Sequence, residues 1–539
     1  YITNWTWDFG DGTFGYGEIV EHLYLSSGEY TIALTVTDDE NASSSYSKTI
    51  LIDIIPPDTI KTVGTPKYGS NDEWVTSHTE FNLTATDDFS GVNKTYYRIW
   101  HNDAWSDWIE YHGNFTLTGE GRHCLEYYSV DNAGNIEEVH NQTHFVDDIS
   151  PVTTIEFGTP YYTDNTEKWI TTSTLIYLNA TDYPECACGV ETTYYCVDGG
   201  DWHEYTEPFT IDEECQHTIE YYSIDYLGNE EEHHIITVYV DNTPPVTTIE
   251  FGTPYYTNGT DEWITSWTTI YLNATDYPSC ASSGVKEIWY SYDNGTTWHS
   301  TTGNNATFTI PDECKRIIKW YAVDNLGNTE EIHSIEVKVD DTPPVTLLEE
   351  SEPYYIDDRG IWVTSDTMLY LNATDYPSCG CGVNSSWYKI DDGSWNLYPG
   401  RIVILEEGEH TLYYYSVDNL GNSEVIKNQT IYVDDTPPTT LIDVEYGDTY
   451  YTYDPETGRM VEHREIRSVK LTADDSNGVD HCMVYWATRD PFGRLIWHSQ
   501  PDSVTFKGDA AKEVVEFYSV DALGNQESVR RADWATPIH

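Results

Sequence analysis

The chain has 539 residues, with 92 Asp and Glu against 26 Lys and Arg, which gives a formal net charge of −66 at pH 7. This excludes nucleic acid as an expected partner, because phosphate binding needs clusters of Lys and Arg. High acidity can indicate disorder, but aromatic residues make up 14% of the sequence, which predicts packed β cores instead. No apolar run is long enough to span a bilayer. The chain opens within a strand pattern rather than with a secretory signal, so we expect it to continue beyond both ends.

The first 55 residues differ from the rest. Three motifs follow one another there, namely Trp5-Thr-Trp-Asp-Phe-Gly-Asp-Gly12, His22-Leu-Tyr24 and Gly28-Glu-Tyr-Thr-Ile-Ala-Leu-Thr-Val-Thr-Asp38. In this order they resemble the second half of a PKD domain, which implies an Ig-like sandwich common on archaeal and bacterial surfaces. The resemblance departs from the family at its start, where a strand or two is missing. Either the sequence holds a fragment of the domain, or another chain supplies the missing strand.

The remainder of the chain repeats one unit five times. An Asp-x-x-Gly-Asn motif recurs about every 95 residues, beginning at Asp131, Asp225, Asp324, Asp418 and Asp521. Between the motifs lie short segments rich in β-branched and aromatic residues, such as 175–181 and 217–224, which are bounded by Gly, Asn, Asp or Pro. We therefore predict an all-β protein without a convincing helix, built as a linear string of Ig-like antiparallel β-sandwich domains.

Acidic, proline-rich links mark the predicted boundaries. Sequences such as Asp241-Asn-Thr-Pro-Pro245 join successive units, and proline holds itself and its predecessor in extended, stiff backbone. We predict a PKD-like module at 1–55, followed by repeat 1 at 56–149, repeat 2 at 150–242, repeat 3 at 243–341, repeat 4 at 342–435 and a divergent repeat 5 at 436–539. Repeat 5 is less acidic than the others, so it is also a candidate for docking onto a neighbouring copy.

Short motifs recur inside the repeats. Repeat 1 carries Thr84-Ala-Thr-Asp87, Ser90-Gly-Val92 and Tyr128-Ser-Val-Asp131, and repeat 4 carries Asp391-Asp-Gly-Ser-Trp395 and Gly408-Glu-His-Thr411. These motifs resemble the Ig-like repeats that prokaryotes attach to adhesins, surface-layer proteins, surface filaments and secreted hydrolases. The resemblance implies the fold and a cell-surface location. Because that family has no single activity, it names no ligand.

Acidic residues recur around the links and are the candidate metal ligands. Hard carboxylate oxygens gathered in loops suit Ca²⁺, so we predict structural calcium held by three sets of aspartates. The sets are Asp87, Asp182, Asp276, Asp375 and Asp474 after a strand; Asp131, Asp225, Asp324, Asp418 and Asp521 before x-x-Gly-Asn; and Asp241, Asp340, Asp341, Asp434 and Asp435 at the links. The alternative is that these side chains only cap turns through nearby backbone hydrogen bonds.

The ten cysteines predict disulfides and therefore an oxidising, extracellular compartment. Cys280 and Cys314 are the only two in repeat 3, and Cys186 and Cys215 fall at the matching points of repeat 2, so we expect one disulfide within each repeat. Cys188 with Cys196 is a further candidate pair. Cys379 and Cys381 either pair with each other under strain or stay free, and Cys124 and Cys482 are either buried thiols or form intermolecular links.

Sequons of the form Asn-x-Ser/Thr are dense and predict N-linked glycans. The candidate sites are Asn82, Asn93, Asn114, Asn179, Asn258, Asn273, Asn294, Asn305, Asn372, Asn384 and Asn428. Asn179, Asn273 and Asn372 share one repeat position, for which a structural role is the alternative.

Four tryptophans, each linked to a turn signal, also recur at one position per repeat. They are Trp105, Trp202, Trp298 and Trp395. A position that recurs in this way is typical of core or sheet-face packing, and we expect core packing here. Stacking on sugars is the alternative.

No nucleophile elbow, metalloprotease helix or phosphate-binding loop occurs, so we expect no enzyme activity. The sequence predicts an extracellular structural or adhesive protein, archaeal rather than bacterial, in which calcium and disulfides hold a rigid, glycosylated rod within a surface filament, surface layer or adhesin. Its expected partners are copies of itself, other surface proteins and N-linked glycans. The alternatives are a non-catalytic accessory region of a secreted protease or glycoside hydrolase, and a glycan-binding array.

Overall fold

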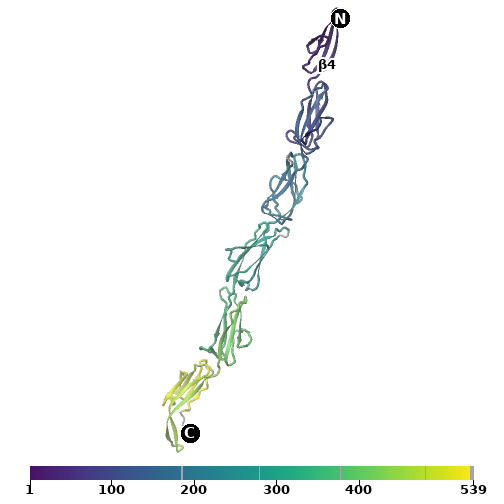
Figure 1. Cartoon of the computed structure of the whole chain (residues 1–539). Coiled ribbons are helices and arrows are strands. Elements are labelled where there is room, and N and C mark those ends of the chain that lie inside the picture. The colour runs from purple at the N-terminus through teal and green to yellow at the C-terminus, as the bar shows by residue number, and fades with distance from the viewer. Residues whose placement is uncertain (184–185, 278–279, 377, 477, 480, 535–539) are drawn as a thin grey trace. The chain divides into compact units, whose positions relative to one another are not determined.

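A computed structural model describes residues 1–183, 186–277, 280–376, 378–476, 478–479 and 481–534. Regular structure in this part is almost entirely β-strand (Figure 1). The helix that it contains is α1 (Ala510–Glu513). The chain divides into two compact units. The first holds Tyr1–Pro245, Asp276–Val285 and Val323–Thr329, and the second holds Val246–Thr275, Lys286–Ala322 and Glu330–His539. The predicted all-β class is confirmed.

The PKD-like module is one four-stranded sheet in the order β2-β1-β3-β4. Its strands are β1 (Ile2–Asp8), β2 (Phe14–Tyr16), β3 (Gly28–Asp38) and β4 (Ser43–Ile52). Side chains alternate between the two faces of a strand. On one face Thr35 and Ser45 share a hydroxyl hydrogen bond of 2.7 Å, whereas Trp5 and Val36 pair across the other face. The sheet is therefore amphipathic.

Repeat 1 pairs a small sheet, β5-β8, with a large one in the order β10-β9-β12-β13-β7-β6, and β11 also pairs with β9. The strands are β5 (Asp58–Val63), β6 (Lys67–Tyr68), β7 (Trp74–Val75), β8 (Phe81–Thr86), β9 (Val92–His101), β10 (Ala104–Trp105), β11 (Ile109–Glu110), β12 (Gly121–Asp131) and β13 (His140–Val146). Pairing is antiparallel except between β7 and β13, which run parallel.

Repeat 2 has the same plan, with β14-β17 as the small sheet and β15-β16-β21-β20-β18-β19 as the large one. The strands are β14 (Val152–Phe157), β15 (Tyr161–Thr163), β16 (Lys168–Ile170), β17 (Ile176–Thr181), β18 (Val190–Val197), β19 (His203–Glu204), β20 (Cys215–Asp225) and β21 (His234–Val240). Alternate residues of β20 are buried, as in a strand with one face on a core. Ile176 from the small sheet meets Ile219 and Val238 from the large sheet in that core, all fully buried.

Repeats 3 and 4 follow this plan within the second unit, apart from the segments of repeat 3 that belong to the first. Their small sheets are β22-β25-β28 and β31-β34, and their large sheets are β23-β24-β30-β29-β26-β27 and β32-β33-β38-β37-β35-β36. The strands of repeat 3 are β22 (Val246–Phe251), β23 (Tyr255–Thr257), β24 (Glu262–Ile264), β25 (Ile270–Thr275), β26 (Val285–Ser291), β27 (His299–Thr302), β28 (Asn305–Phe308), β29 (Cys314–Asp324) and β30 (His333–Val339). Those of repeat 4 are β31 (Val345–Glu350), β32 (Tyr354–Ile356), β33 (Ile361–Val363), β34 (Leu369–Thr374), β35 (Val383–Ile390), β36 (Asn396–Leu397), β37 (Gly408–Asp418) and β38 (Lys427–Val433).

Repeat 5 departs from the plan through a long hairpin of two 16-residue strands, β39 (Thr439–Asp454) and β40 (Arg459–Asp474). These join β43 in one sheet, and the second sheet has the order β42-β41-β44-β45. The remaining strands are β41 (Met483–Arg489), β42 (Leu495–Pro501), β43 (Ser503–Lys507), β44 (Glu516–Val520) and β45 (Arg530–Arg531). Two facing sheets thus recur in all five repeats, as expected of β-sandwiches.

Candidate cation sites at the repeat junctions

Each of repeats 2–5 is joined to the repeat before it by a link aspartate that is bonded on both sides. Asp147 donates its backbone N–H to the Val75 carbonyl of repeat 1 at 2.9 Å. On the repeat 2 side, its Oδ2 accepts the Cys188 N–H at 2.7 Å and its carbonyl accepts Asn229 Nδ2 at 3.0 Å. Asp241, Asp340 and Asp434 make the corresponding three bonds at the next links.

Two further aspartates of the following repeat lie beside the link aspartate. Asp182 comes directly after β17, and its Oδ2 accepts the Gly189 N–H at 2.8 Å. Asp225 ends β20, and its carboxylate accepts the backbone N–H and the side-chain amide of Asn229 at 2.8 and 2.7 Å. These bonds are those of turn-capping side chains. The turn-capping role therefore accounts for some of the carboxylate oxygens of Asp182 and Asp225.

The three aspartates converge to form what we call a junction cluster. One ligand atom from each of Asp147, Asp182, Cys188 and Asp225 lies within 4.8 Å of the others. The other junction clusters are Asp53, Asp87 and Asp131; Asp241, Asp276 and Asp324; and Asp340, Asp375, Cys381 and Asp418. The structure therefore places close together aspartates from separate loops that the sequence analysis predicted as separate sets.

In each junction cluster one carboxylate oxygen is buried without a hydrogen-bond partner among the described residues. It is Oδ1 of the strand-end aspartate, in Asp87, Asp182, Asp276 and Asp375. Burial raises the pKa of Asp182, Asp276 and Asp375 to about 6, and the neighbouring aspartates add to that shift. An acceptor oxygen without a donor, among carboxylates that repel one another, fits a bound cation.

The fifth junction differs from the prediction by one residue. Strand register pairs Thr439 with Asp474, as it pairs Val152 with Thr181. Asp475, and not the predicted Asp474, therefore occupies the strand-end position. Asp474 is exposed.

Asp341 and Asp435 were also predicted as ligands, but each side chain accepts a backbone hydrogen bond from a turn of the preceding repeat. Asp341 Oδ1 accepts the Ser266 N–H at 2.8 Å, and Asp435 Oδ1 accepts the Ser365 N–H at 2.9 Å. In each of these two link pairs, the carboxylate of the first aspartate accepts a hydrogen bond from the next repeat. We therefore remove the second aspartate from the candidate ligands.

Disulfides join consecutive repeats, so the predicted pairing within repeats is wrong. Cys215 pairs with Cys280 and Cys314 with Cys379. The physical reason is that β20 and β29 start at the end of the sandwich beside the following repeat, where the loop after a strand-end aspartate supplies the partner. Among the described residues, the free cysteines are Cys124, Cys186, Cys188, Cys196, Cys381 and Cys482.

Sequence reasoning missed two kinds of junction residue. Asp53 and Asp147 belong to the clusters, and their place in the acidic links was the available signal. A recurring Trp-Ile/Val-Thr sequence was the signal for the other kind. Trp74 Nε1 donates to the Cys186 carbonyl at 3.0 Å and Trp263 Nε1 to the Cys379 carbonyl at 2.9 Å, so an indole contacts the following repeat's loop.

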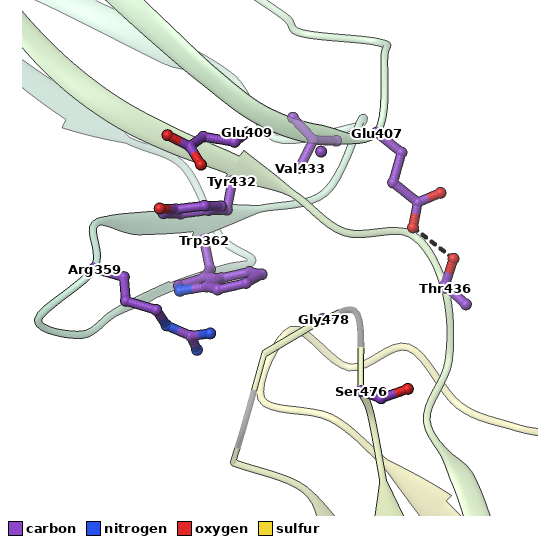
Figure 2. Close-up of a pocket in the computed structure, with 10 residues that line it drawn as sticks. Arg359, Trp362, Glu407, Glu409, Tyr432, Val433, Thr436, Ser476 and Gly478 are labelled. Carbon is purple, nitrogen blue, oxygen red and sulfur yellow. Dashed lines mark hydrogen bonds between the residues drawn. The ribbon is translucent and has the colours of Figure 1, made fainter.

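The corresponding Trp362 lines a cavity of about 540 Å³ between repeats 4 and 5, which Figure 2 shows. Its indole is 4% exposed, and its N–H has no carbonyl partner of that kind among the described residues. Tyr432 stacks on one face of the ring and Arg359 lies over the other, 4.5 and 4.4 Å away (Figure 2). The loop after Asp475 reaches its glycine, Gly478, sooner in the sequence than the corresponding loops of repeats 2–4.

The recurring tryptophans do not pack in the core as expected. Trp202 is 41% exposed and meets Tyr222 edge-on, with ring centroids 4.9 Å apart. Trp105 is equally exposed, and in repeat 1 it is Trp108 that makes the equivalent contact, with Tyr128. Trp298 and Trp395 are half-buried and meet tyrosines in the same way. These side chains therefore lie on the outer face of the large sheet.

The candidate glycosylation sites are mostly accessible. Asn82 and Asn273 are half-buried, and the other nine predicted asparagines are exposed. Asn82 Nδ2 also donates to Asn114 Oδ1 at 2.9 Å. Attachment of a glycan stays a prediction at all of these positions.

A comparison with known families supports the first resemblance. The family model of the PKD domain matches residues 1–54. The PKD resemblance is confirmed for that stretch. The resemblance of the five repeats to prokaryotic surface repeats stays a prediction. No helix that the structure describes is both long and apolar enough to cross a membrane.

Two solved structures with which this chain aligns consist of modules or tandem repeats. Fibronectin(III)-like modules of Clostridium thermocellum CbhA are 17% identical, with a TM-score of 0.21, covering 35% of this chain and 94% of that chain. A tetra-tandem repeat in the extending region of a large adhesion protein is 16% identical, with a TM-score of 0.27, covering 70% of this chain and 99% of that chain.

Proposed function

We propose that this chain is an extracellular structural or adhesive cell-surface protein whose repeats are held in register by cations at their junctions. Four features support the proposal: a PKD match, tandem β-sandwiches, disulfides between consecutive repeats, and a charge of −66 that favours bound cations. Its work is mechanical and requires no catalysis. Assembly is with copies of itself or with other surface proteins.

The junction cluster is the observation that carries this proposal. The link aspartate Asp147 bonds Val75 on one side and Cys188 on the other, so a ligand bound to its carboxylate acts on both repeats at once. Two carboxylates within 4.8 Å of each other repel by roughly 3.5 kcal/mol or more at an effective dielectric constant near 20. A cation removes that repulsion and thereby favours the closed junction.

Calcium suits the donor set because it takes six to eight oxygen ligands, mono- or bidentate, in flexible geometry. In repeat 1 the residues that would hold it are Asp53, Asp87 and Asp131, with the free Oδ1 of Asp87 as the first ligand. The corresponding aspartates serve the other junctions. Bound calcium would supply positive charge and a shared anchor for the link and two loops.

Calorimetry on matched variants tests this site. Calcium should raise the melting temperature of the chain above that in EDTA, and Asp87→Asn should remove one equivalent of binding. Asp88→Asn is the control, because Asp88 is the next residue and is exposed. Equal melting temperatures in EDTA and in millimolar calcium would refute cation-held junctions.

Surface location has its own test. Antibodies raised against the purified chain should label intact source cells, and mass spectrometry of native peptides should find glycan on exposed sequons such as Asn93 and Asn384. Labelling that requires broken cells would contradict the proposal.

The alternative function is an accessory region of a secreted protease or glycoside hydrolase. The exposed tryptophans favour this alternative where it includes sugar binding, because Trp202 presents its ring to solvent. A catalytic domain encoded beside this sequence, together with hits on a glycan array, would support it over a structural protein.

A further inference from the structure

One position in the junction clusters changes its chemistry from repeat to repeat. The residue before the recurring glycine is Cys188 in repeat 2 and Cys381 in repeat 4, but Ser90 in repeat 1 and Ser283 in repeat 3. Its backbone N–H donates to the link aspartate in every case, at 2.7 Å for Cys188, 2.8 Å for Cys381 and Ser283, and 3.0 Å for Ser90. The side chain therefore leaves the backbone at the same point of each junction cluster.

The two thiols are placed among the carboxylates. Cys188 Sγ lies within 4.8 Å of ligand oxygens from Asp147, Asp182 and Asp225, and Cys381 Sγ has the same relation to its own three aspartates. The residues are 7% and 5% exposed, and neither forms a disulfide. Each thiol thus adds a sulfur to three carboxylates in a buried space.

Unpartnered polar atoms remain in these clusters. Ser283 is 5% exposed, and its Oγ has no hydrogen-bond partner among the described residues, although its N–H contacts Asp241. The buried Oδ1 of Asp276 in the same cluster lacks a partner too, as do those of Asp182 and Asp375 in the thiol clusters. Buried polar atoms usually have partners, so their recurrence beside this position indicates a ligand in contact with it.

Resting on the proposed cation function, we propose that this position selects the metal at each junction. Calcium prefers all-oxygen ligands, which the serine clusters supply. Soft thiolate ligands favour zinc and related ions, and three carboxylates with one thiolate make up the four ligands that zinc takes. The clusters of Cys188 and Cys381 therefore bind a thiophilic divalent cation of the zinc class, and the clusters of Ser90 and Ser283 bind calcium.

The sulfur ligand of such a metal is a thiolate and not a thiol. Binding then forms one metal–sulfur bond and releases one proton to solvent for each thiol.

Cobalt(II) is a suitable probe, because its bond to a thiolate gives a charge-transfer band in the near ultraviolet. Titration of the whole chain should give a band that saturates with two equivalents assigned to these thiols. Those two equivalents should be lost in the double variant Cys188→Ser/Cys381→Ser. Repeats 1 and 3 already have serine at this position, so the fold is expected to accept the substitution. Cys124→Ser, which alters a free thiol outside the clusters, is the control and should leave the band unchanged.

The reciprocal variant Ser283→Cys should add one equivalent to the band. A band of unchanged amplitude in the double variant, or no thiolate band in the native chain, would overturn the selection. Calcium melting of the native chain, compared with its cobalt band, separates the two proposals. Stabilisation by calcium without a thiolate band refutes the selection alone. A cysteine-dependent band without any effect of calcium refutes the calcium junctions but leaves the thiol sites standing.

Discussion

Gly121 faces Cys186 across the junction between repeats 1 and 2, where a β-carbon on Gly121 would lie 3.7 Å from the Cys186 sulfur. Gly121 begins β12 as Cys215 begins β20. The two positions are 65 residues apart (186 − 121), which is also the separation of both disulfides. The first junction therefore has the geometry of a disulfide and lacks only its second sulfur.

Gly121→Cys should create that missing disulfide with Cys186. The backbone is suited to the change, because Gly121 has a φ of +100° and Cys215 already adopts +96° at the same position. Closing a loop of this length should stabilise the first junction by about 2–4 kcal/mol. Non-reducing peptide mapping should find the linked peptides, and the gain in melting temperature should vanish with reductant.

The double variant Gly121→Cys/Cys186→Ser is the control for that experiment. It carries the same strained residue without a partner, so it should show no linked peptide and no reductant-sensitive stabilisation. A free introduced thiol in the single variant, under oxidising conditions, would mean that the junction is not held as the structure shows it.

Repetition made much of the candidate site predictable. Aspartates that recur after a strand and before x-x-Gly-Asn must occupy equivalent loops of each sandwich, so their convergence could be anticipated. The cysteine pairing could not be predicted, because comparing the repeats with one another does not show which loops of one repeat lie beside the next. Cys215 and Cys280 are in different repeats but at one junction.

Residue-level errors arose where local patterns were ambiguous. Asp474 and Asp475 are adjacent, and only the pairing of β39 with β40 shows which of them follows the strand position of Thr181. Likewise, the exposure of Trp202 depends on which face of the large sheet meets the small one. That is a property of tertiary packing, and the spacing of the tryptophans alone leaves it open.

A buried carboxylate joins the two sheets of repeat 2, and loss of the hydroxyl that donates to it should be costly. Glu231 is 6% exposed, and its carboxylate accepts the Thr153 N–H at 2.9 Å and the Thr153 hydroxyl. Ser223 Oγ also bonds that hydroxyl, at 2.6 Å. Thr153→Val removes the hydroxyl that donates to the Glu231 carboxylate, whereas Ser223 Oγ keeps its bond to Thr193 at 2.8 Å. Because the buried carboxylate loses a donor, the variant should destabilise repeat 2 by about 1–3 kcal/mol. Hydrogen exchange of β14 and β20 measures the loss.

Thr154→Val is the matched control for Thr153→Val. The neighbouring hydroxyl is exposed and donates only to the Asn179 carbonyl, at 3.2 Å, so its removal should change the stability of repeat 2 by less than about 0.5 kcal/mol. Equal effects of the two variants would show that the buried network contributes nothing specific.

The stability of repeat 4 should fall as pH rises above neutrality. Burial lowers the pKa of His410, but its hydrogen bonds to Asp391 and to the Glu406 carbonyl raise it more, so the net pKa lies above the ordinary 6.5. A raised histidine pKa contributes stability that is complete below the unfolded value and is lost as pH rises through the folded value. Urea unfolding followed by hydrogen exchange in β37 should therefore show lower stability at pH 8 than at pH 6.

Asp391→Asn should flatten that dependence on pH, because the amide no longer favours the charged imidazole. The variant should lose stability at pH 6 and little at pH 8. An unchanged pH profile in Asp391→Asn would assign the dependence to other groups.

The indole contacts at the junctions provide a final matched pair. Trp263 donates to the Cys379 carbonyl, whereas Trp362, equally buried, reaches no such carbonyl among the described residues. Both substitutions to phenylalanine remove the indole N–H and similar ring volume, and of the two described tryptophans only Trp263 gives up a hydrogen bond to a carbonyl of the following repeat. Trp263→Phe should destabilise its junction by about 1 kcal/mol more than Trp362→Phe destabilises the last one, because the Cys379 carbonyl loses its donor. Hydrogen exchange of the two links measures both losses in one chain, and equal losses would mean that the indoles act through packing alone.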